Sequence, residues 1–142
     1  ARPFGQAFQL GERVVDVPTK VEPGALITRV SRFDLALSAV GVEWDAGKMS
    51  AFIHPAAANG VQERRIGFLT PLANWKYALY SLERARRYSA ELGYVLDAEE
   101  EAVVWSVFAR QALEVRSDMV ERYRSCSPGR FGVPEDIACR HP

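Results

Sequence analysis

Between residues 70 and 125 the apolar side chains recur every three or four positions, which is the period of an α-helix. The apolar stripe of the first part begins with Leu72, Trp75, Leu79 and Leu82 and continues through Ala85 or Arg86 and Ser89 to Leu92. The stripe of the second part consists of Trp105, Phe108, Ala112, Val115 and Met119. The pattern predicts two long amphipathic helices, at about 71–92 and 98–125.

Residues with helix-capping chemistry lie at the ends of both predicted helices. Thr70 can cap the first helix and Pro71 suits its first position, while Gly93 favours the left-handed conformation in which helices end. Asp97 and Glu100 have the spacing of a capping box at the start of the second helix. Because only a few residues join the two helices, we expect them to pack antiparallel as a hairpin.

The N-terminal half carries weaker signals. Residues 1–24 hold so many prolines and glycines that we expect an irregular arm, with a short strand at 13–17. The aromatic side chains of this arm, Phe4 and Phe8, need a cover from the protein's own core or from a neighbour. The β-branched run at 25–30 predicts another strand.

Residues 32–45 fit two patterns. Helical spacing competes with the strand-like alternation of Val40, Val42 and Trp44, and Gly41 disfavours a helix by ~1 kcal/mol, so we favour strands. The other elements expected in this half are a strand at 48–54, a loop at 55–60 and a strand at 65–69.

Together these elements predict an α+β protein, in which a small antiparallel sheet from the N-terminal half packs on the long helical hairpin. If residues 32–45 form a helix, the protein is instead mainly α. A length of 142 residues suits one domain spanning 1–142. Within it we expect 1–24 to form the arm and 126–142 to form an irregular tail, because both segments are rich in proline and glycine.

Composition narrows the kinds of partner. The 18 basic residues balance 18 acidic ones, so no overall field draws the chain to nucleic acid. No segment approaches the ~20 apolar residues that cross a bilayer, and we expect no membrane insertion. We expect a soluble protein, cytoplasmic if Ala1 follows a removed methionine and otherwise the mature chain of an exported or organellar protein.

Both cysteines, Cys126 and Cys139, lie in the predicted tail. A disulfide between them would close a loop of ~14 residues, contribute ~3 kcal/mol and indicate an oxidising compartment. Two free thiols in a reducing compartment are the alternative. With His141 the two cysteines still lack a fourth zinc ligand, so we expect no metal site.

Few residues offer catalytic chemistry. His54 can act as a general base with Glu43 or Asp45 if the intervening segments form a hairpin, and a purely structural histidine is the alternative. The glycines do not form a phosphate-binding loop, and we expect no cofactor. The catalytic hypothesis is a small enzyme or ligand-binding domain with a pocket between the sheet and the helical hairpin.

One flank of the first predicted helix carries aromatic and basic side chains outside the apolar stripe. We call Tyr77, Tyr80, Arg84, Arg87 and Tyr88 the Tyr/Arg flank. Tyrosine and arginine are enriched in binding hot spots, although the sheet or the tail is an alternative cover for this flank. We therefore favour a non-catalytic interaction protein, either an accessory subunit or a small inhibitor or adaptor. It would dock through its helical hairpin onto another protein or a second copy of itself.

Overall fold

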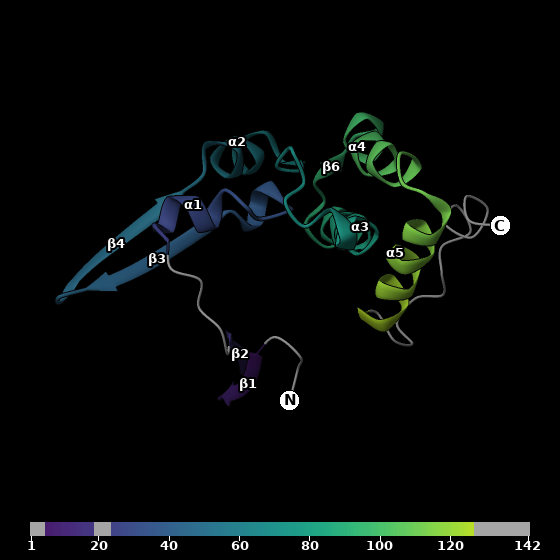
Figure 1. The fold of residues 1–142 in the computed structure, drawn as a ribbon. Coiled ribbons are helices and arrows are strands. Elements are labelled where there is room, and N and C mark those ends of the chain that lie inside the picture. The colour runs from purple at the N-terminus through teal and green to yellow at the C-terminus, as the bar shows by residue number, and fades with distance from the viewer. Residues whose placement is uncertain (1–4, 19–23, 127–142) are drawn as a thin grey trace.

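The computed structural model describes residues 5–18 and 24–126 of the chain (Figure 1). Its elements in order are β1 (Gly5–Leu10), β2 (Arg13–Pro18), α1 (Leu26–Val30), the 3₁₀ turn η1 (Ala36–Ser38), β3 (Val40–Asp45), β4 (Lys48–Ile53), α2 (Pro55–Glu63), β5 (Arg65–Ile66), the 3₁₀ turn η2 (Trp75–Tyr77), α3 (Ala78–Leu92), β6 (Val95–Leu96), α4 (Ala98–Ala109) and α5 (Leu113–Cys126). The chain therefore combines α and β structure, as the sequence predicts.

The strands of the described residues form three separate pairs rather than the one small sheet that we expected. The pairs β1–β2 and β3–β4 are antiparallel hairpins, and β5–β6 is a short parallel pair. Part of the segment predicted as an irregular arm is thus a hairpin. Alternating apolar positions in β1 and β2 favour such pairing, which outweighs the prolines and glycines around them.

A tight turn sets the register of β3–β4. Ala46 and Gly47 both have positive φ, at 46° and 80°, as a two-residue hairpin turn of type I′ requires. The strands pair without a bulge from Val40 opposite Ile53 to Asp45 opposite Lys48. The strand favoured within 32–45 is confirmed only for 40–45, because residues 36–38 form η1, and the strand predicted at 48–54 is confirmed as β4. Together β3 and β4 form an arm that projects from α1 and α2 (Figure 1).

Two short segments that the sequence predicts as a strand and a loop are helical. The expected strand at 25–30 is the helix α1, and the expected loop at 55–60 begins the helix α2. His54 caps α2, because its Nδ1 accepts a hydrogen bond from the Ala56 N–H at 3.1 Å, and Pro55 follows at the first helical position. Histidine followed by proline thus supplies the start signal that the sequence reading missed.

The first long helix begins later than predicted. Thr70 and Pro71 do not start it: a turn and η2 precede α3, whose first residue is Ala78. The reason is packing, because Leu72 reaches the core from the irregular segment and is 6% exposed. The predicted end is confirmed, since Gly93 has a φ of 66°.

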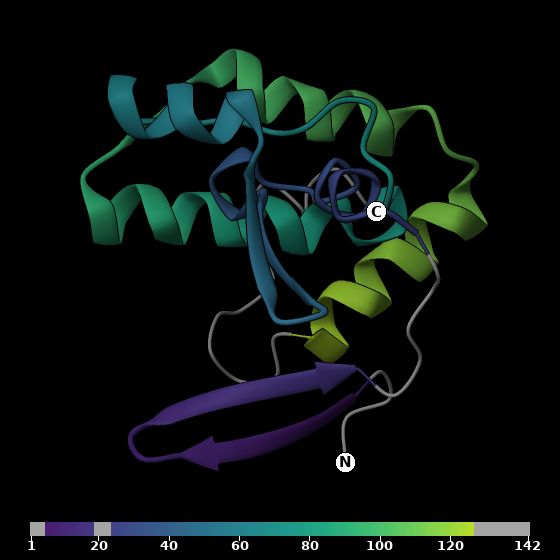
Figure 2. The ribbon, with the colours of Figure 1, turned by 90° about the vertical axis from the view of Figure 1, so that its left-hand side faces the viewer.

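The second long helix is broken. After α4 the Gln111 side chain donates a hydrogen bond to the carbonyl of Val107 at 3.0 Å, and the chain turns before α5 begins. Figure 2 shows α5 leaving the line of α4 at an angle. The break places Met119 and Tyr123 of α5 in the core beside α3. One continuous helix would not direct these side chains there.

The predicted capping box at the start of α4 is also absent. Asp97 occupies the N-cap position without a side-chain capping bond and instead forms an ion pair with Arg65. Glu100 accepts a hydrogen bond from the Phe68 N–H at 2.9 Å. Both carboxylates therefore hold the β5 region against α4. Their partners, which are distant in sequence, replace the hydrogen bonds that a local capping box would form.

The main core lies between α3, α4 and α5. Its most buried side chains include Leu35, Ile66, Leu79, Val104 and Phe108. A smaller cluster, around Val30, Ala39 and Ala57, joins α1 to η1 and α2. The β1–β2 and β3–β4 hairpins contribute no side chain to the buried set of either cluster.

The predicted tail at 126–142 lies almost wholly outside the described residues. Cys126 ends α5, and Cys139 is not described, so their disulfide stays a prediction. Among the described helices, none is both long and apolar enough to span a bilayer.

Candidate interaction surfaces

The β3–β4 arm has one face made only of apolar residues. In an antiparallel pair, residues directly opposite each other share a face, and faces alternate along each strand. The register places three pairs on one side of the arm: Val40 with Ile53, Val42 with Ala51, and Trp44 with Met49. We call these six residues the apolar arm face.

The apolar arm face is open to solvent. Trp44 is 69% exposed, Met49 is 64% exposed and Val42 is 62% exposed. Scaling ordinary side-chain areas by the exposed fractions gives roughly 600 Å² for the whole face, which is as large as the largest apolar patch on an ordinary monomer. A scattered exposed leucine needs no explanation, but a contiguous face of this size marks a candidate interaction surface.

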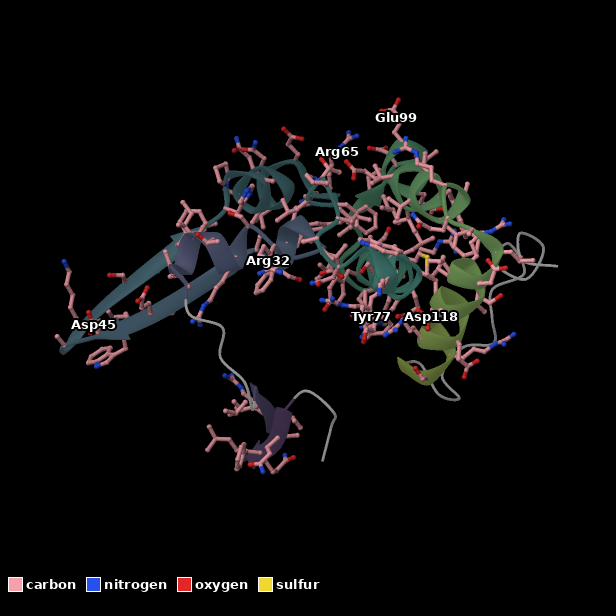
Figure 3. All side chains as sticks on the ribbon, in the orientation of Figure 1. Arg32, Asp45, Arg65, Tyr77, Glu99 and Asp118 are labelled. Atoms are coloured by element: carbon pink, nitrogen blue, oxygen red, sulfur yellow. The ribbon has the colours of Figure 1, made fainter. Side chains whose placement is uncertain are left out.

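The opposite face of the arm is different. Near its base, a Cβ added to Gly41 would lie 2.6 Å from Leu26 Cδ1 and 2.8 Å from Val30 Cγ2, so α1 packs directly on the arm there. Towards the tip this face carries Glu43 opposite Ser50, and then Asp45 opposite Lys48 (Figure 3). One face is thus anchored and solvated, while the apolar arm face has no cover among the described residues.

The β1–β2 hairpin repeats this arrangement. One of its faces holds the pairs Gln6 with Val17, Phe8 with Val15, and Leu10 with Arg13. Its apolar members are exposed: Phe8 by 50%, Leu10 by 70%, Val15 by 43% and Val17 by 46%. We call this the apolar face of β1–β2. The expectation that Phe8 is covered by the protein's own core or by a neighbour stays a prediction.

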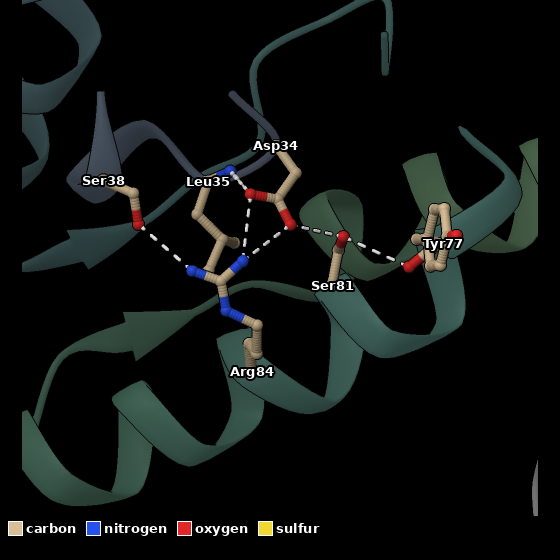
Figure 4. A network of polar contacts seen from close by, with 6 residues as sticks. All are labelled: Asp34, Leu35, Ser38, Tyr77, Ser81 and Arg84. Carbon is tan, nitrogen blue, oxygen red and sulfur yellow. Dashed lines mark hydrogen bonds and ion pairs between the residues drawn. The ribbon is translucent and has the colours of Figure 1, made fainter. Parts of the chain in front are cut away.

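Arg84, the centre of the predicted Tyr/Arg flank, is held within the protein (Figure 4). Its Nη1 lies 3.1 and 3.2 Å from the two carboxylate oxygens of Asp34, and its Nη2 lies 3.4 Å from Ser38 Oγ. The same carboxylate accepts hydrogen bonds from the Ser81 hydroxyl and from the Leu35 N–H. The network ties α3 to the segment that leads into η1.

The electrostatics of Arg84 agree with this role. Burial lowers its pKa, but the charge of Asp34 and the contacts with Tyr88 and Tyr80 outweigh burial, so the pKa is raised above its ordinary value. The guanidinium therefore stays charged at every accessible pH. Its function in the described structure is to hold two segments together.

The other flank residues have partners too. The Arg84 guanidinium lies 5.9 Å from the Tyr80 ring centroid and 5.8 Å from that of Tyr88, and Arg87 lies 5.2 Å from Tyr88. Both tyrosines are half-buried against the main core. Tyr77 stands apart from this group, since its hydroxyl accepts a hydrogen bond from Arg122 of α5 at 3.1 Å. The structure brings four of the five residues together; their binding role stays a prediction.

The structure separates the residues of the catalytic hypothesis. Glu43 is paired with Ser50 and Asp45 with Lys48, which places the two carboxylates ~13 and ~20 Å along the strand from His54. His54 itself caps α2 and packs edge-on against the Phe52 ring at 6.4 Å. His54 therefore has a structural role, and neither carboxylate is close enough to orient its ring.

The described residues contain no group of three or more histidine, cysteine, aspartate or glutamate side chains arranged to hold a metal ion. Comparison of the chain with protein-family models, with curated proteins and with solved structures gave no match.

Sequence reasoning missed the apolar arm face, although its signal was present. The alternation of Val40, Val42 and Trp44 predicts a strand, and Met49 and Ile53 alternate in the same way after the turn. Alternation in both strands predicts an amphipathic hairpin. Alternation alone does not show whether the apolar side of the hairpin faces the protein's own core. In this structure the apolar side faces solvent.

Proposed function

We propose that this chain is a non-catalytic interaction protein, an accessory subunit of a larger assembly or a small inhibitor or adaptor, which docks through the apolar arm face. The observation that carries the proposal is the exposure of six apolar side chains on one face of a projecting hairpin. Contiguous apolar surface of this size on a soluble protein is typical of a protein–protein contact.

The area of the apolar arm face is large enough to support a specific complex. Covering roughly 600 Å² at ~25 cal/mol per Å² gives ~15 kcal/mol of gross transfer free energy. Association costs of ~4–15 kcal/mol are subtracted from this value, which leaves ~0–11 kcal/mol before the ordering of side chains is counted. Trp44 would be the anchor, because tryptophan dominates binding hot spots and is here 69% exposed.

The form of the arm supports the same function. An isolated two-stranded hairpin is marginally stable in water, so a projecting one gains order when a partner covers its apolar side. The polar residues near the tip, Glu43, Asp45 and Lys48, lie on the other face or at the turn. A partner can therefore cover the apolar arm face without burying these charges.

Affinity purification of the full chain from its native source, followed by mass spectrometry, tests the proposal with two matched variants. Val42→Lys places a charge in the centre of the apolar arm face, whereas Ser50→Lys places the same charge on the opposite face. We expect Val42→Lys to lose the co-purifying protein or second copy and Ser50→Lys to retain it, with unchanged circular dichroism for both. Equal retention by the two variants would refute the proposed surface.

The Tyr/Arg flank is a second candidate surface for the same function. The sequence predicts that the protein docks through its helical hairpin, which carries this flank. Arg87 supports it, because its guanidinium stacks over Tyr88 and its side chain stays 32% exposed. Arg87→Glu is a better probe than a change of Arg84, because Arg87 forms a longer ion pair, at 3.6 Å, with Glu83 of the same helix, whereas Arg84 holds Asp34 of another segment. The control is Arg124→Glu on α5, a residue with a 58% exposed side chain. A complex that tolerates both substitutions equally does not use the flank.

A further inference from the structure

One chain carries two hairpins that each leave an apolar face uncovered by the rest of residues 5–18 and 24–126. We propose that two copies of this chain form a dimer by reciprocal exchange, in which the apolar face of β1–β2 in each copy packs on the apolar arm face of the other. This inference rests on the proposed function, because it names the partner for the same surface.

The two hairpins match in size and in the distribution of polar groups. All four strands contain six residues and pair without interruption, so both faces are ~20 Å long. Two such sheets pack face to face at ~10 Å with interdigitating side chains. On β1–β2 the polar members, Gln6 and Arg13, lie at opposite ends of the face, and Phe8 with Val15 lies at its centre. A central apolar patch with a polar rim is the usual anatomy of an interface.

The area favours exchange over simpler pairing. The apolar face of β1–β2 exposes roughly 400 Å² and the apolar arm face roughly 600 Å², so a reciprocal dimer covers on the order of 2,000 Å² in total. That total lies within the range of stable specific interfaces. Pairing of two apolar arm faces with each other would cover only ~1,200 Å², at the lower limit, and would leave Phe8 and Leu10 exposed.

The path of the chain favours a second copy as the occupant over the hairpin of the same copy. The helix α1 packs on the Gly41 side of the arm, through Leu26 and Val30. The chain therefore reaches the arm, through α1, on the side opposite the apolar arm face. Seven residues separate β2 from α1, a length that reaches at most ~25 Å, and within one copy β1–β2 would have to lie on the far side of the arm from α1 to cover the apolar arm face. A second copy approaches that side directly. Exchange of one element between identical chains is a common route to dimers.

Sedimentation equilibrium of the full chain tests the proposal with two pairs of variants. Val42→Lys alters the apolar arm face, and Val15→Lys alters the apolar face of β1–β2. Ser50→Lys and Gln9→Lys place the same charge on the opposite face of each hairpin. We expect a wild-type dimer, unchanged dimers for the two control variants, and dimerisation weakened at least 100-fold by either Val42→Lys or Val15→Lys. Circular dichroism verifies that each variant is folded.

A mixing experiment separates exchange from other dimers. Val42→Lys retains an intact β1–β2, and Val15→Lys retains an intact apolar arm face. Equimolar mixing of the two weakened variants should therefore restore a heterodimer with one intact contact, of intermediate affinity. Neither pairing of identical faces nor packing within one copy predicts this recovery.

The other outcomes overturn the proposal. A Val15→Lys variant that dimerises like the wild type would mean that β1–β2 is not the occupant. A monomeric wild type at ~100 µM would exclude the dimer, whether β1–β2 packs within its own copy or not at all. If the wild type is monomeric and Val42→Lys still loses a different co-purifying protein, the proposed function stands and only the identity of the partner is wrong.

Discussion

The substitution Asp34→Ala tests whether the polar network beneath α3 holds the fold together. Asp34 accepts hydrogen bonds from the Leu35 N–H, the Ser81 hydroxyl and the Arg84 guanidinium. Its removal leaves the N–H of a fully buried Leu35 without its acceptor and leaves the Arg84 charge without its carboxylate. Ser81 retains a partner in the carbonyl of Tyr77 at 3.2 Å.

The expected loss combines these terms. An unsatisfied buried N–H costs ~1–3 kcal/mol. Breaking a buried ion pair costs ~3–5 kcal/mol, but the Arg84 side chain is 22% exposed and can turn towards water, which reduces this term to ~1–2 kcal/mol. We therefore expect Asp34→Ala to lower the free energy of unfolding by ~2–5 kcal/mol. With an m-value of ~2 kcal/mol/M, the urea midpoint should fall by ~1–2.5 M.

Urea denaturation followed by circular dichroism is the assay, with Asp118→Ala as control. Asp118 also pairs with an arginine, Arg122, but its side chain is 48% exposed, so its loss should cost less than ~1 kcal/mol. A double-mutant cycle with Arg84→Ala should give a coupling of ~1 kcal/mol or more. If Asp34→Ala is within ~0.5 kcal/mol of the wild type, the network does not hold the α3 contact and the reasoning fails.

Two further substitutions test the core and a helix end by the same assay. Leu79→Ala, at a side chain only 1% exposed in the main core, should cost ~2–5 kcal/mol by leaving a cavity, and a loss under ~1 kcal/mol would contradict the placement of that core. Gly93→Ala, at a φ of 66°, should cost ~1 kcal/mol because alanine is strained in the left-handed region, and a stabilised variant would show that α3 ends differently.

Local signals in the sequence predicted part of this fold well. The alternation of Val40, Val42 and Trp44 located β3, and Gly93 located the end of α3, since each depends on chemistry within a few residues. The break before α5 could not be predicted in this way. It depends on Met119 and Tyr123 reaching a core built by α3, which the periodicity of one segment does not describe. Asp97 and Glu100 illustrate the same limit, because their partners lie in the β5 region.

The candidate site follows the same division. Sequence reasoning identified the Tyr/Arg flank, and the structure brings Tyr80, Arg84, Arg87 and Tyr88 together, with Arg84 occupied by Asp34. It could not identify the apolar arm face, because exposure is a property of the packed molecule. A hydrophobic face has the same sequence pattern whether it lies on the core or in solvent.

The central claim is that the apolar arm face is covered when the protein is assembled with its partner. Hydroxyl-radical footprinting measures this directly, because the chain has two methionines of opposite exposure: Met49 is 64% exposed on the arm and Met119 is 1% exposed in the core. Met119 serves as the internal reference. In the assembled protein from its native source we predict that Met49 is oxidised several-fold more slowly than in the purified Val42→Lys variant. Equal oxidation of Met49 in both would mean that nothing covers the arm, and would contradict the account.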